Sequence, residues 1–380
     1  MKQLYPLSVF LTEYSEKNNG NKYRPVAVGR YGIRSRESIY SKELAKDYSK
    51  NKLIHKNTLT VGMGSVQIDI GVLTDAITYS VSPAYHTYRI VGINAAYLRY
   101  CLECRNQDMF SRFVKRGSRQ GKTIDLKRWL TYEIPVPDPV RQTEIVDRLD
   151  RVSALIEKRQ EQLLQLDELV KSRFIDLFGD PVSNPLGWEM VPLGKRCEIV
   201  TGNTPSRAEP ENYGEFIEWI KSDNINTPFT FITEAQEYLS ETGFKKCRFV
   251  EAGSLLMTCI AGSINCIGNV AVTDRRVAFN QQINAIVPEQ DKVLYLYWLM
   301  LLSKPAIHST INMALKGILS KGQLSELAFP FPPIELQEQF AAFVEQTDKS
   351  KYYSSFSYHL CRQAASNYRQ EWMTCRTSNS

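Results

Sequence analysis

The sequence predicts a mixed α/β (α+β) protein in which two similar domains are joined by a long coiled-coil helix. Three observations indicate this fold. A Pro-rich segment followed by a Gln- and Glu-rich helix start occurs at residues 135–149 and again 195 positions later at residues 330–344. Apolar residues follow the first copy at heptad spacing. Short strand-like segments alternate with apolar helices on either side of this region, as expected for a long-period internal repeat.

The length and composition of the chain suit two globular domains. The 380 residues suffice for two domains of ordinary size and a connector, and the 43% hydrophobic content allows each domain a core. No apolar run approaches the ~18 residues that span a bilayer, and the first residues form no apolar signal region. We therefore expect a cytoplasmic protein with no membrane contact.

The cysteines do not indicate a metal site. Of eight cysteines, only Cys101 and Cys104 have Cys-x-x-Cys spacing, and no second pair completes four zinc ligands. We expect free thiols and no bound metal.

Charge is distributed unevenly between the two halves. Residues 1–135 carry 22 Lys and Arg against 11 Asp and Glu, whereas residues 180–330 carry 13 against 16. The first half therefore has the charge of a nucleic-acid-binding domain, although a basic domain can also be merely soluble. The second half would need a local basic face on an acidic surface.

The two expected domains have the same mixture of predicted strands and helices. They cover residues 1–137 and residues 181–332, and the sequence predicts that each is a compact mixed α/β domain. The expected elements are strands at 57–61, 85–91, 254–258 and 283–287, and helices at 95–113 and 294–302.

The segment between these domains, residues 138–180, is predicted to be the central helix. Counting from Ile145 in alternating steps of four and three residues places eight apolar residues along one side of the helix, its coiled-coil seam. They are Ile145, Leu149, Val152, Ile156, Leu163, Leu166, Val170 and Leu177. At ~1.5 Å per residue, 39 helical residues give a rod of roughly 58 Å, which ends at Gly179-Asp180-Pro181. The alternative is a long helix that lies against one domain.

The second helix start, residues 333–350, loses this pattern. The same steps reach Thr347, Ser350, Ser354 and Ser357, which are not apolar. We therefore expect residues 351–380 to be an atypical, disordered tail, and interpret them as a frameshifted or recombined end.

Several segments of the two domains carry a family resemblance. In the second domain these are Thr201-Gly-Asn-Thr-Pro-Ser206, Tyr213, Ile217-Glu-Trp-Ile-Lys-Ser-Asp223 and Phe279-Asn-Gln-Gln282. In the first domain they are Leu73-Thr-Asp75 and Ser82-Pro-Ala-Tyr85, and each domain ends with the Pro-rich strand and the Gln- and Glu-rich helix start. Together, over about residues 5–348, these segments resemble the specificity (S) subunit of type I restriction-modification systems, with the first domain a variant of the same target recognition domain.

The resemblance implies two target recognition domains at opposite ends of a pair of antiparallel helices with pseudo-twofold symmetry. Each domain would read one half of a split DNA target, and the helices would set the gap and dock two modification (M) subunits. Those subunits would methylate adenine with S-adenosylmethionine, and restriction (R) subunits would supply ATP- and Mg-dependent cleavage. This chain itself would hold no cofactor.

Candidate DNA-binding residues follow from major-groove chemistry, in which Arg or Lys reads guanine, Asn or Gln reads adenine, and other cations hold phosphates. In the first domain they are Arg30, Tyr31, Arg34, Arg36, Arg116, Ser118, Arg119, Gln120 and Lys122. In the second they are Thr204, Ser206, Lys221, Asn224, Gln282, Lys316 and Lys321. A structural or merely solvent-exposed role is the alternative for each.

The sequence offers little support for catalysis in this chain. Asn184-Pro-Leu-Gly187 lacks the second proline and the aromatic residue of adenine methylases. Asp125-Leu-Lys127 lacks the upstream acidic residue of a nuclease core, and no P-loop spacing occurs. We expect a non-catalytic DNA-recognition subunit.

Two alternatives remain open at this stage. One is a silent specificity subunit with impaired assembly, in which the unpaired helix seam allows self-association. The other is a stand-alone DNA-binding regulator or coiled-coil scaffold.

We predict that Arg34→Ala or Arg119→Ala weakens binding to the target duplex, because each removes a cation from the basic first domain. Titration of labelled duplex by fluorescence anisotropy measures this, and unchanged affinity in both variants would remove these residues from the interface.

Overall fold

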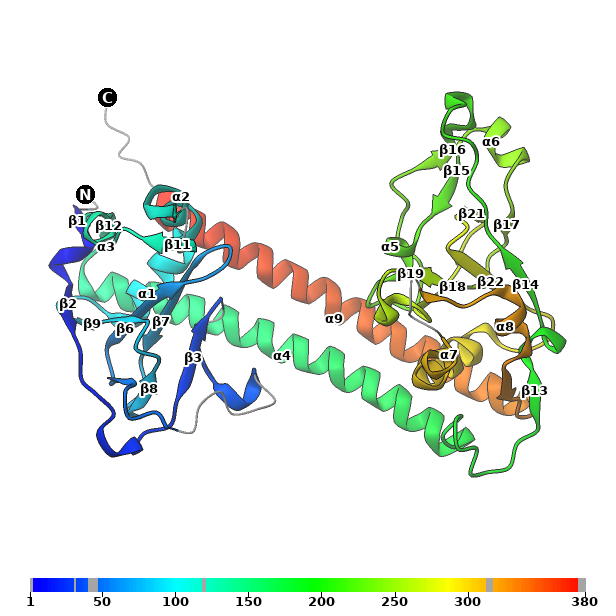
Figure 1. Ribbon diagram of the computed structural model, residues 1–380, viewed down its shortest axis with the longest axis horizontal. Coiled ribbons are helices and arrows are strands. Elements are labelled where there is room, and N and C mark those ends of the chain that lie inside the picture. Colours follow the sequence, from blue (N-terminus) through cyan, green and yellow to red (C-terminus); the bar gives the residue numbers. More distant parts are fainter. Residues whose placement is uncertain (1–2, 31, 40–46, 118–120, 312–316, 375–380) are drawn as a thin grey trace. The chain divides into compact units, whose positions relative to one another are not determined.

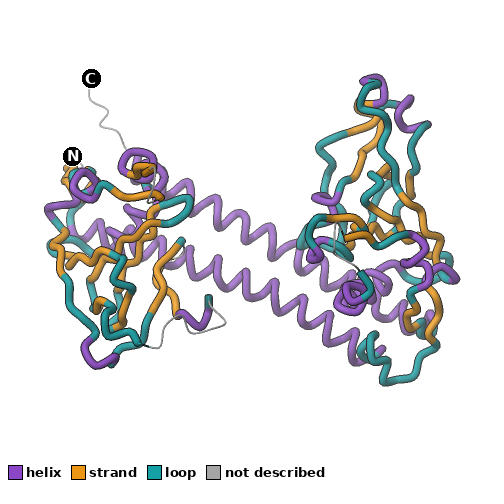
Figure 2. The backbone as a smooth tube through the Cα atoms, viewed as in Figure 1, coloured by secondary structure: helices purple, strands orange, loops and turns teal. Residues whose placement is uncertain are grey.

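The computed structural model describes residues 3–30, 32–39, 47–117, 121–311 and 317–374 (Figures 1 and 2). The chain forms two compact units: residues 1–158 with 358–380, and residues 159–357. Two long helices, α4 (Pro139–Phe178) and α9 (Ile334–Thr374), each contribute residues to both units. Each unit therefore combines residues from more than one of the sequence domains expected above, because the long helices are divided between the units.

The first unit is built on an antiparallel four-stranded sheet in the order β2-β9-β6-β7. Its strands are Leu11–Tyr14 (β2), His86–Ile90 (β9), Thr58–Met63 (β6) and Ile68–Leu73 (β7). Apolar side chains of the sheet share a core with helices α1 (Ala95–Cys104) and α2 (Asn106–Phe113), so the single helix expected over 95–113 is two helices. Trp129 at the end of the short helix α3 (Leu126–Trp129) is fully buried in this core.

Smaller two-stranded sheets complete the first unit. Strands β3 and β4 approach β7 so closely that a Cβ on Gly71 would lie 2.6 Å from the Ile33 side chain, which explains the glycine. The paired strands are Val26–Gly29 (β3) with Gly32–Ser35 (β4), Lys52–Ile54 (β5) with Tyr79–Val81 (β8), and Val114–Gly117 (β10) with Gly121–Ile124 (β11).

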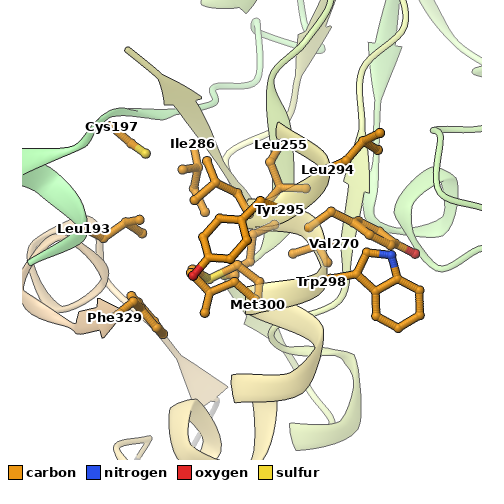
Figure 3. Close-up of a cluster of buried hydrophobic side chains, with 14 of the residues drawn as sticks. Leu193, Cys197, Leu255, Val270, Ile286, Leu294, Tyr295, Trp298, Met300 and Phe329 are labelled. Carbon is orange, nitrogen blue, oxygen red and sulfur yellow. The ribbon is translucent and has the colours of Figure 1, made fainter. Parts of the chain in front are cut away.

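The second unit repeats the four-stranded sheet in the order β14-β22-β18-β20. Its strands are Cys197–Thr201 (β14), Ile283–Pro288 (β22), Leu255–Thr258 (β18) and Val270–Val272 (β20). One face packs on helix α7 (Val293–Ser309), where Leu255 and Ile286 meet Tyr295 and Met300 (Figure 3). Successive strand residues point to opposite faces, so the neighbouring Leu256 joins a different core with Ile220 and Phe279.

A second sheet of the order β16-β15-β21-β17 covers that opposite face. Its strands are Tyr238–Leu239 (β16), Tyr213–Ile220 (β15), Val277–Phe279 (β21) and Phe249–Val250 (β17). The remaining elements of this unit are α5 (Ser222–Ile225), α6 (Glu241–Lys245), α8 (Lys321–Glu326), and strands β19 (Ile260–Ala261) and β23 (Gly317–Ile318).

The internal repeat is visible in how each unit closes. Strand β1 (Gln3–Pro6) pairs with β12 (Glu133–Val136), just as β13 (Met190–Pro192) pairs with β24 (Ala328–Pro330). In the first unit the Tyr97 hydroxyl donates to the carbonyl oxygen of Pro135 at 2.6 Å. In the second, the Tyr295 hydroxyl donates to the carbonyl oxygen of Pro330 at 2.7 Å.

The repeated glutamine joins each unit to its long helix, and we call this contact the glutamine latch. The Gln142 side chain accepts a hydrogen bond from the Asn94 backbone N–H at 2.9 Å and donates to the Pro137 carbonyl at 2.8 Å. Gln337 accepts from the Lys292 N–H at 3.0 Å and donates to the Pro332 carbonyl at 2.9 Å. Each latch therefore ties the start of α1 or α7 to the turn that precedes α4 or α9.

The seam residues expected on α4 lie on its buried side. Ile145, Leu149 and Val170 are buried, and the other five are partly exposed. Phe174 and Phe178, which the seam did not include, are also buried and stack against Tyr295 and Phe340 with ring centroids 4.9–5.6 Å apart.

The two helices run antiparallel where they meet. In the second unit Phe174 contacts Phe340, while the earlier Asp167 pairs with the later Lys351 at 2.6 Å. In the first unit Arg148 lies over the Tyr368 ring at 5.7 Å.

Helix α9 continues to Thr374, so the expectation of a disordered tail from residue 351 is wrong for residues 351–374. Residues 375–380 lie outside the described part. The heptad positions are filled by small side chains: Thr347, Ser354 and Ala365 are buried. The Thr347 hydroxyl donates a hydrogen bond to the Phe343 carbonyl at 2.9 Å, which allows this polar side chain to remain buried in the seam.

The described helices include none that is both long and apolar enough to cross a membrane. Cys101 and Cys104 are free thiols, and burial raises their pKa values to about 12 and about 11. Within the described ranges, His, Cys, Asp and Glu side chains form no group of three suited to a metal ion.

We predict that Gln337→Ala lowers the free energy of unfolding by at least about 2 kcal/mol, because it removes the partner of the Lys292 N–H and the donor to the buried Pro332 carbonyl and Asp291 carboxylate. Gln337 is fully buried, whereas Gln339 on the same helix is exposed and serves as the control. Urea unfolding of both variants measures the difference, and equal effects of the two changes would contradict the latch.

Candidate nucleic-acid interface

In the second unit, two segments singled out from the sequence lie against each other. The loop at residues 201–206 packs on the turn at residues 279–282, where the Asn203 N–H donates to the Phe279 carbonyl at 3.1 Å. A Cβ on Gly202 would lie 2.2 Å from the carbonyl oxygen of Asn280. Only glycine allows this approach, which explains the Thr-Gly-Asn sequence of the loop.

The Asn203 side chain fastens a third segment to this site. Its amide donates to the Lys246 carbonyl at 2.9 Å and accepts from the Arg248 N–H at 2.8 Å. Lys245, Lys246 and Arg248 are all exposed, so these hydrogen bonds place a short basic segment beside the loop, in which Lys246 is paired with Glu209 at 2.6 Å. Arg248 was not among the residues selected from the sequence, because only the fold brings residue 248 to residue 203.

The candidate residues Thr204, Ser206 and Gln282 occupy this site in different ways. Thr204 and Ser206 are exposed, and the Thr204 hydroxyl donates to the side-chain oxygen of Gln281. Gln282 is half-buried, and its backbone N–H donates to the Asn280 side chain at 3.0 Å. The exposed amide of the pair therefore belongs to Gln281.

Lys221 also lies at this site but is paired. Its amine bonds to the Glu237 carboxylate, which accepts a second hydrogen bond from Arg207 at 2.8 Å. Both cations lie over the Trp219 ring, at 5.3 Å for Lys221 and 5.4 Å for Arg207. The hydrogen bond from Lys221, and then that from Arg207, hold the pKa of Glu237 below its usual range despite the opposing effect of partial burial.

The side-chain amide of Asn224 makes hydrogen bonds within the protein. It accepts from the Lys221 N–H at 3.0 Å and donates to the Glu234 carbonyl at 2.9 Å, and the residue is 6% exposed. This arrangement corrects the expectation that Asn224 faces a base.

The last two candidates of the second unit flank strand β23. Lys316 lies outside the described residues. Lys321 is exposed at the start of α8. Strand β23 pairs with β19, whose Ile260 N–H donates to the Gln282 carbonyl at 3.1 Å, so this strand adjoins the same turn.

In the first unit, the turn at residues 64–67 brings the two candidate clusters together. The Gln67 side chain donates to the Arg30 carbonyl at 3.5 Å, at the tip of the β3–β4 hairpin. The Lys122 amine donates to the Ser65 carbonyl from the β10–β11 hairpin and lies over the Phe110 ring at 5.3 Å. Two hairpins with basic residues therefore flank one turn.

The other residues of these hairpins are placed as follows. Arg30 and Arg34 are exposed, and Arg36 lies over the Tyr48 ring at 5.1 Å. Arg116 belongs to strand β10, but its side chain lies outside the description. Tyr31, Ser118, Arg119 and Gln120 lie outside the described residues. Gln67 was missed because its position beside the hairpin depends on the register of β6 and β7.

These surfaces have the chemistry of a nucleic-acid interface. Guanidinium and ammonium groups bind phosphates, while amide and hydroxyl groups can read base edges. The first unit supplies mainly cations, and the second supplies amides and hydroxyls with cations that are partly neutralised by Glu237.

We predict that Glu237→Gln strengthens binding to mixed-sequence duplex DNA, because it frees Arg207 and Lys221 from a carboxylate. Each added phosphate contact steepens the slope of log K against log[salt] by about 0.9, so we expect a steeper slope by roughly one to two between about 50 and 200 mM salt. Anisotropy titrations measure both quantities.

The exposed Glu289 at the other end of β22 provides the matched control, Glu289→Gln. Acidification of the wild type from about pH 7.5 to about pH 5.5 will not mimic Glu237→Gln, because a carboxyl with a lowered pKa stays ionised there. Equal affinities of the two variants would contradict this role of Glu237.

Comparisons with known proteins agree with this duplicated arrangement. The model of the type I restriction modification DNA specificity domain matches residues 9–166 and again residues 185–352. The specificity subunit of the type I restriction enzyme HindI from Haemophilus influenzae is 34% identical over 110 residues, which cover 28% of this chain and 23% of that protein.

A putative type I restriction enzyme MjaX specificity subunit from Methanocaldococcus jannaschii is 21% identical over 276 residues, or 67% of this chain and 62% of that protein. The chain thus spans less than two thirds of either relative. The fold is similar to that of the crystal structure of the type I restriction-modification system S subunit from M. genitalium, with a TM-score of 0.63 at 12% identity over 99% of this chain and 97% of that one.

Two consecutive family matches cover most of the chain and fall on two units with the same sheet order. The protein therefore belongs to the family of type I restriction-modification specificity subunits, which are non-catalytic.

Proposed function

We propose that this chain recognises a bipartite duplex-DNA target for a type I restriction-modification complex, with one half-site read by each unit. The observation that carries the proposal is the duplicated junction, in which Gln142 and Gln337 make the same contacts to a Pro carbonyl and a helix start. Two domains that are attached in the same way to antiparallel helices are suited to two separated half-sites.

The two units would contribute differently to binding. The first unit contains hairpins with Arg30, Arg34 and Lys122, which suit phosphate contacts and guanine readout. The second unit presents Thr204 and Gln281 beside the basic segment 245–248. The first unit would therefore supply most of the salt-dependent affinity, and the second would depend more on hydrogen bonds to bases.

The long helices would fix the half-site spacing and dock the catalytic partners. Phe174 and Phe178 of α4 pack edge-on against Phe340 of α9, which holds the two helices together in the second unit. Two modification subunits would bind S-adenosylmethionine and methylate adenine, and restriction subunits would use ATP and Mg. This chain would position those partners in the cytoplasm without holding a cofactor.

One observation favours a second candidate, a silent specificity subunit with impaired assembly. The buried seam positions of α9 beyond Val344 include Thr347, Ser354 and Ala365, which are smaller than the Ile and Leu residues on the α4 seam. A helix pair with less apolar area to bury is less stable, which would weaken partner docking or permit self-association.

Selection from random duplexes tests the proposal. The chain is co-expressed with its cognate modification subunit, and the purified complex is used to enrich bound DNA for sequencing. We expect a target with two specified segments and an unspecified gap; a single continuous motif or no enrichment would contradict the function.

We predict that matched deletions in the two helices shorten the unspecified gap. Removing residues 152–158 of α4 and 358–364 of α9 keeps the antiparallel register, since Arg148 lies beside Tyr368. Seven helical residues span roughly 10.5 Å, or about three base pairs at 3.4 Å each. An unchanged gap in the same selection would exclude the helices as the spacer.

A further inference from the structure

The turn at residues 279–282 is held rigidly from three sides. The Asn280 N–H donates to the Ile220 carbonyl at 3.1 Å, and the Phe279 carbonyl accepts from the Asn203 N–H at 3.1 Å. The Gln282 carbonyl accepts from the Cys259 N–H at 2.8 Å. A side chain that projects from this turn therefore starts from a fixed backbone, as precise recognition requires.

The two consecutive glutamines of this turn differ in their environment. Gln282 is half-buried, and its side-chain oxygen accepts a hydrogen bond from Asn280, which is itself 8% exposed, at 3.4 Å. Gln281 is exposed. The amide of Gln281 is therefore the one that a ligand can reach.

The Thr204 hydroxyl sets the orientation of that amide. It donates to the side-chain oxygen of Gln281, which distinguishes the oxygen from the nitrogen end. A carbonyl oxygen has a second lone pair, and the amide nitrogen has two N–H donors. Gln281 thus retains an acceptor and a donor side by side.

That donor and acceptor pair matches adenine. In the major groove adenine presents the N7 acceptor beside the N6 donor, whereas guanine presents two acceptors. Asn203 also fastens the exposed basic segment 245–248 to the loop that carries Thr204, although Lys246 there is paired with Glu209 at 2.6 Å and Arg248 donates to the Thr201 carbonyl.

We propose that Gln281 reads an adenine in the half-site of the second unit, and that Thr204 positions its amide. This inference rests on the proposed function and names one specificity-determining contact within it.

The test uses the random-duplex selection on the full complex with five variants. Gln281→Ala is expected to reduce the preference for adenine at one position of the second half-site by roughly 5- to 150-fold, the range of one bidentate contact. Gln281→Glu is expected to shift that position toward cytosine, because a carboxylate accepts from cytosine N4. Thr204→Val should weaken the same preference, and Thr204→Ser should preserve it.

Two controls separate this contact from folding and assembly. Gln290 is exposed beyond the opposite end of β22, so Gln290→Ala should leave the whole motif unchanged. The first half-site should be selected normally in every variant, which shows that the complex is intact.

The outcomes distinguish the two proposals. A wild-type complex that selects no split target would overturn the proposed function together with this contact. A wild-type complex that selects a split target, while Gln281→Ala retains every base preference of the second half, would overturn the Gln281 assignment alone.

Discussion

The fold depends on the buried amide of each glutamine latch. The Pro137 and Pro332 carbonyls lie beyond the ends of strands β12 and β24, and the N–H groups of Asn94 and Lys292 at the starts of α1 and α7 also need partners. Gln142 and Gln337 serve both needs at once, at distances of 2.8–3.0 Å. The same side chain thereby ties each unit to its long helix, and its repetition makes the two junctions alike.

Although the two junctions are alike, the two units expose different kinds of side chains. Around its sheet the first unit adds short hairpins that carry exposed Arg30 and Arg34. The second adds a further sheet, and there Glu237 holds Arg207 and Lys221 in ion pairs. In the proposed function the first unit would therefore supply most of the electrostatic attraction to phosphates, while the second would depend more on amides and hydroxyls.

Much of this architecture follows from local sequence. The repeated Pro and Gln positions predict the duplication, and the heptads predict the buried side of α4. Partners distant in sequence explain two of the errors. The pairing of Lys221 with Glu237 and the choice between Gln281 and Gln282 depend on how strands meet. The end of the second helix was missed because Thr347 can satisfy its hydroxyl within the helix and remain buried.

If one chain directs modification to two linked half-sites, methylation-aware sequencing of host DNA will reveal it. The chain and its cognate modification subunit are expressed together in a host that lacks other adenine methylation. We expect methyladenine in both halves of a split motif. Methyladenine confined to a continuous motif, or absent while the two proteins co-purify, would contradict it.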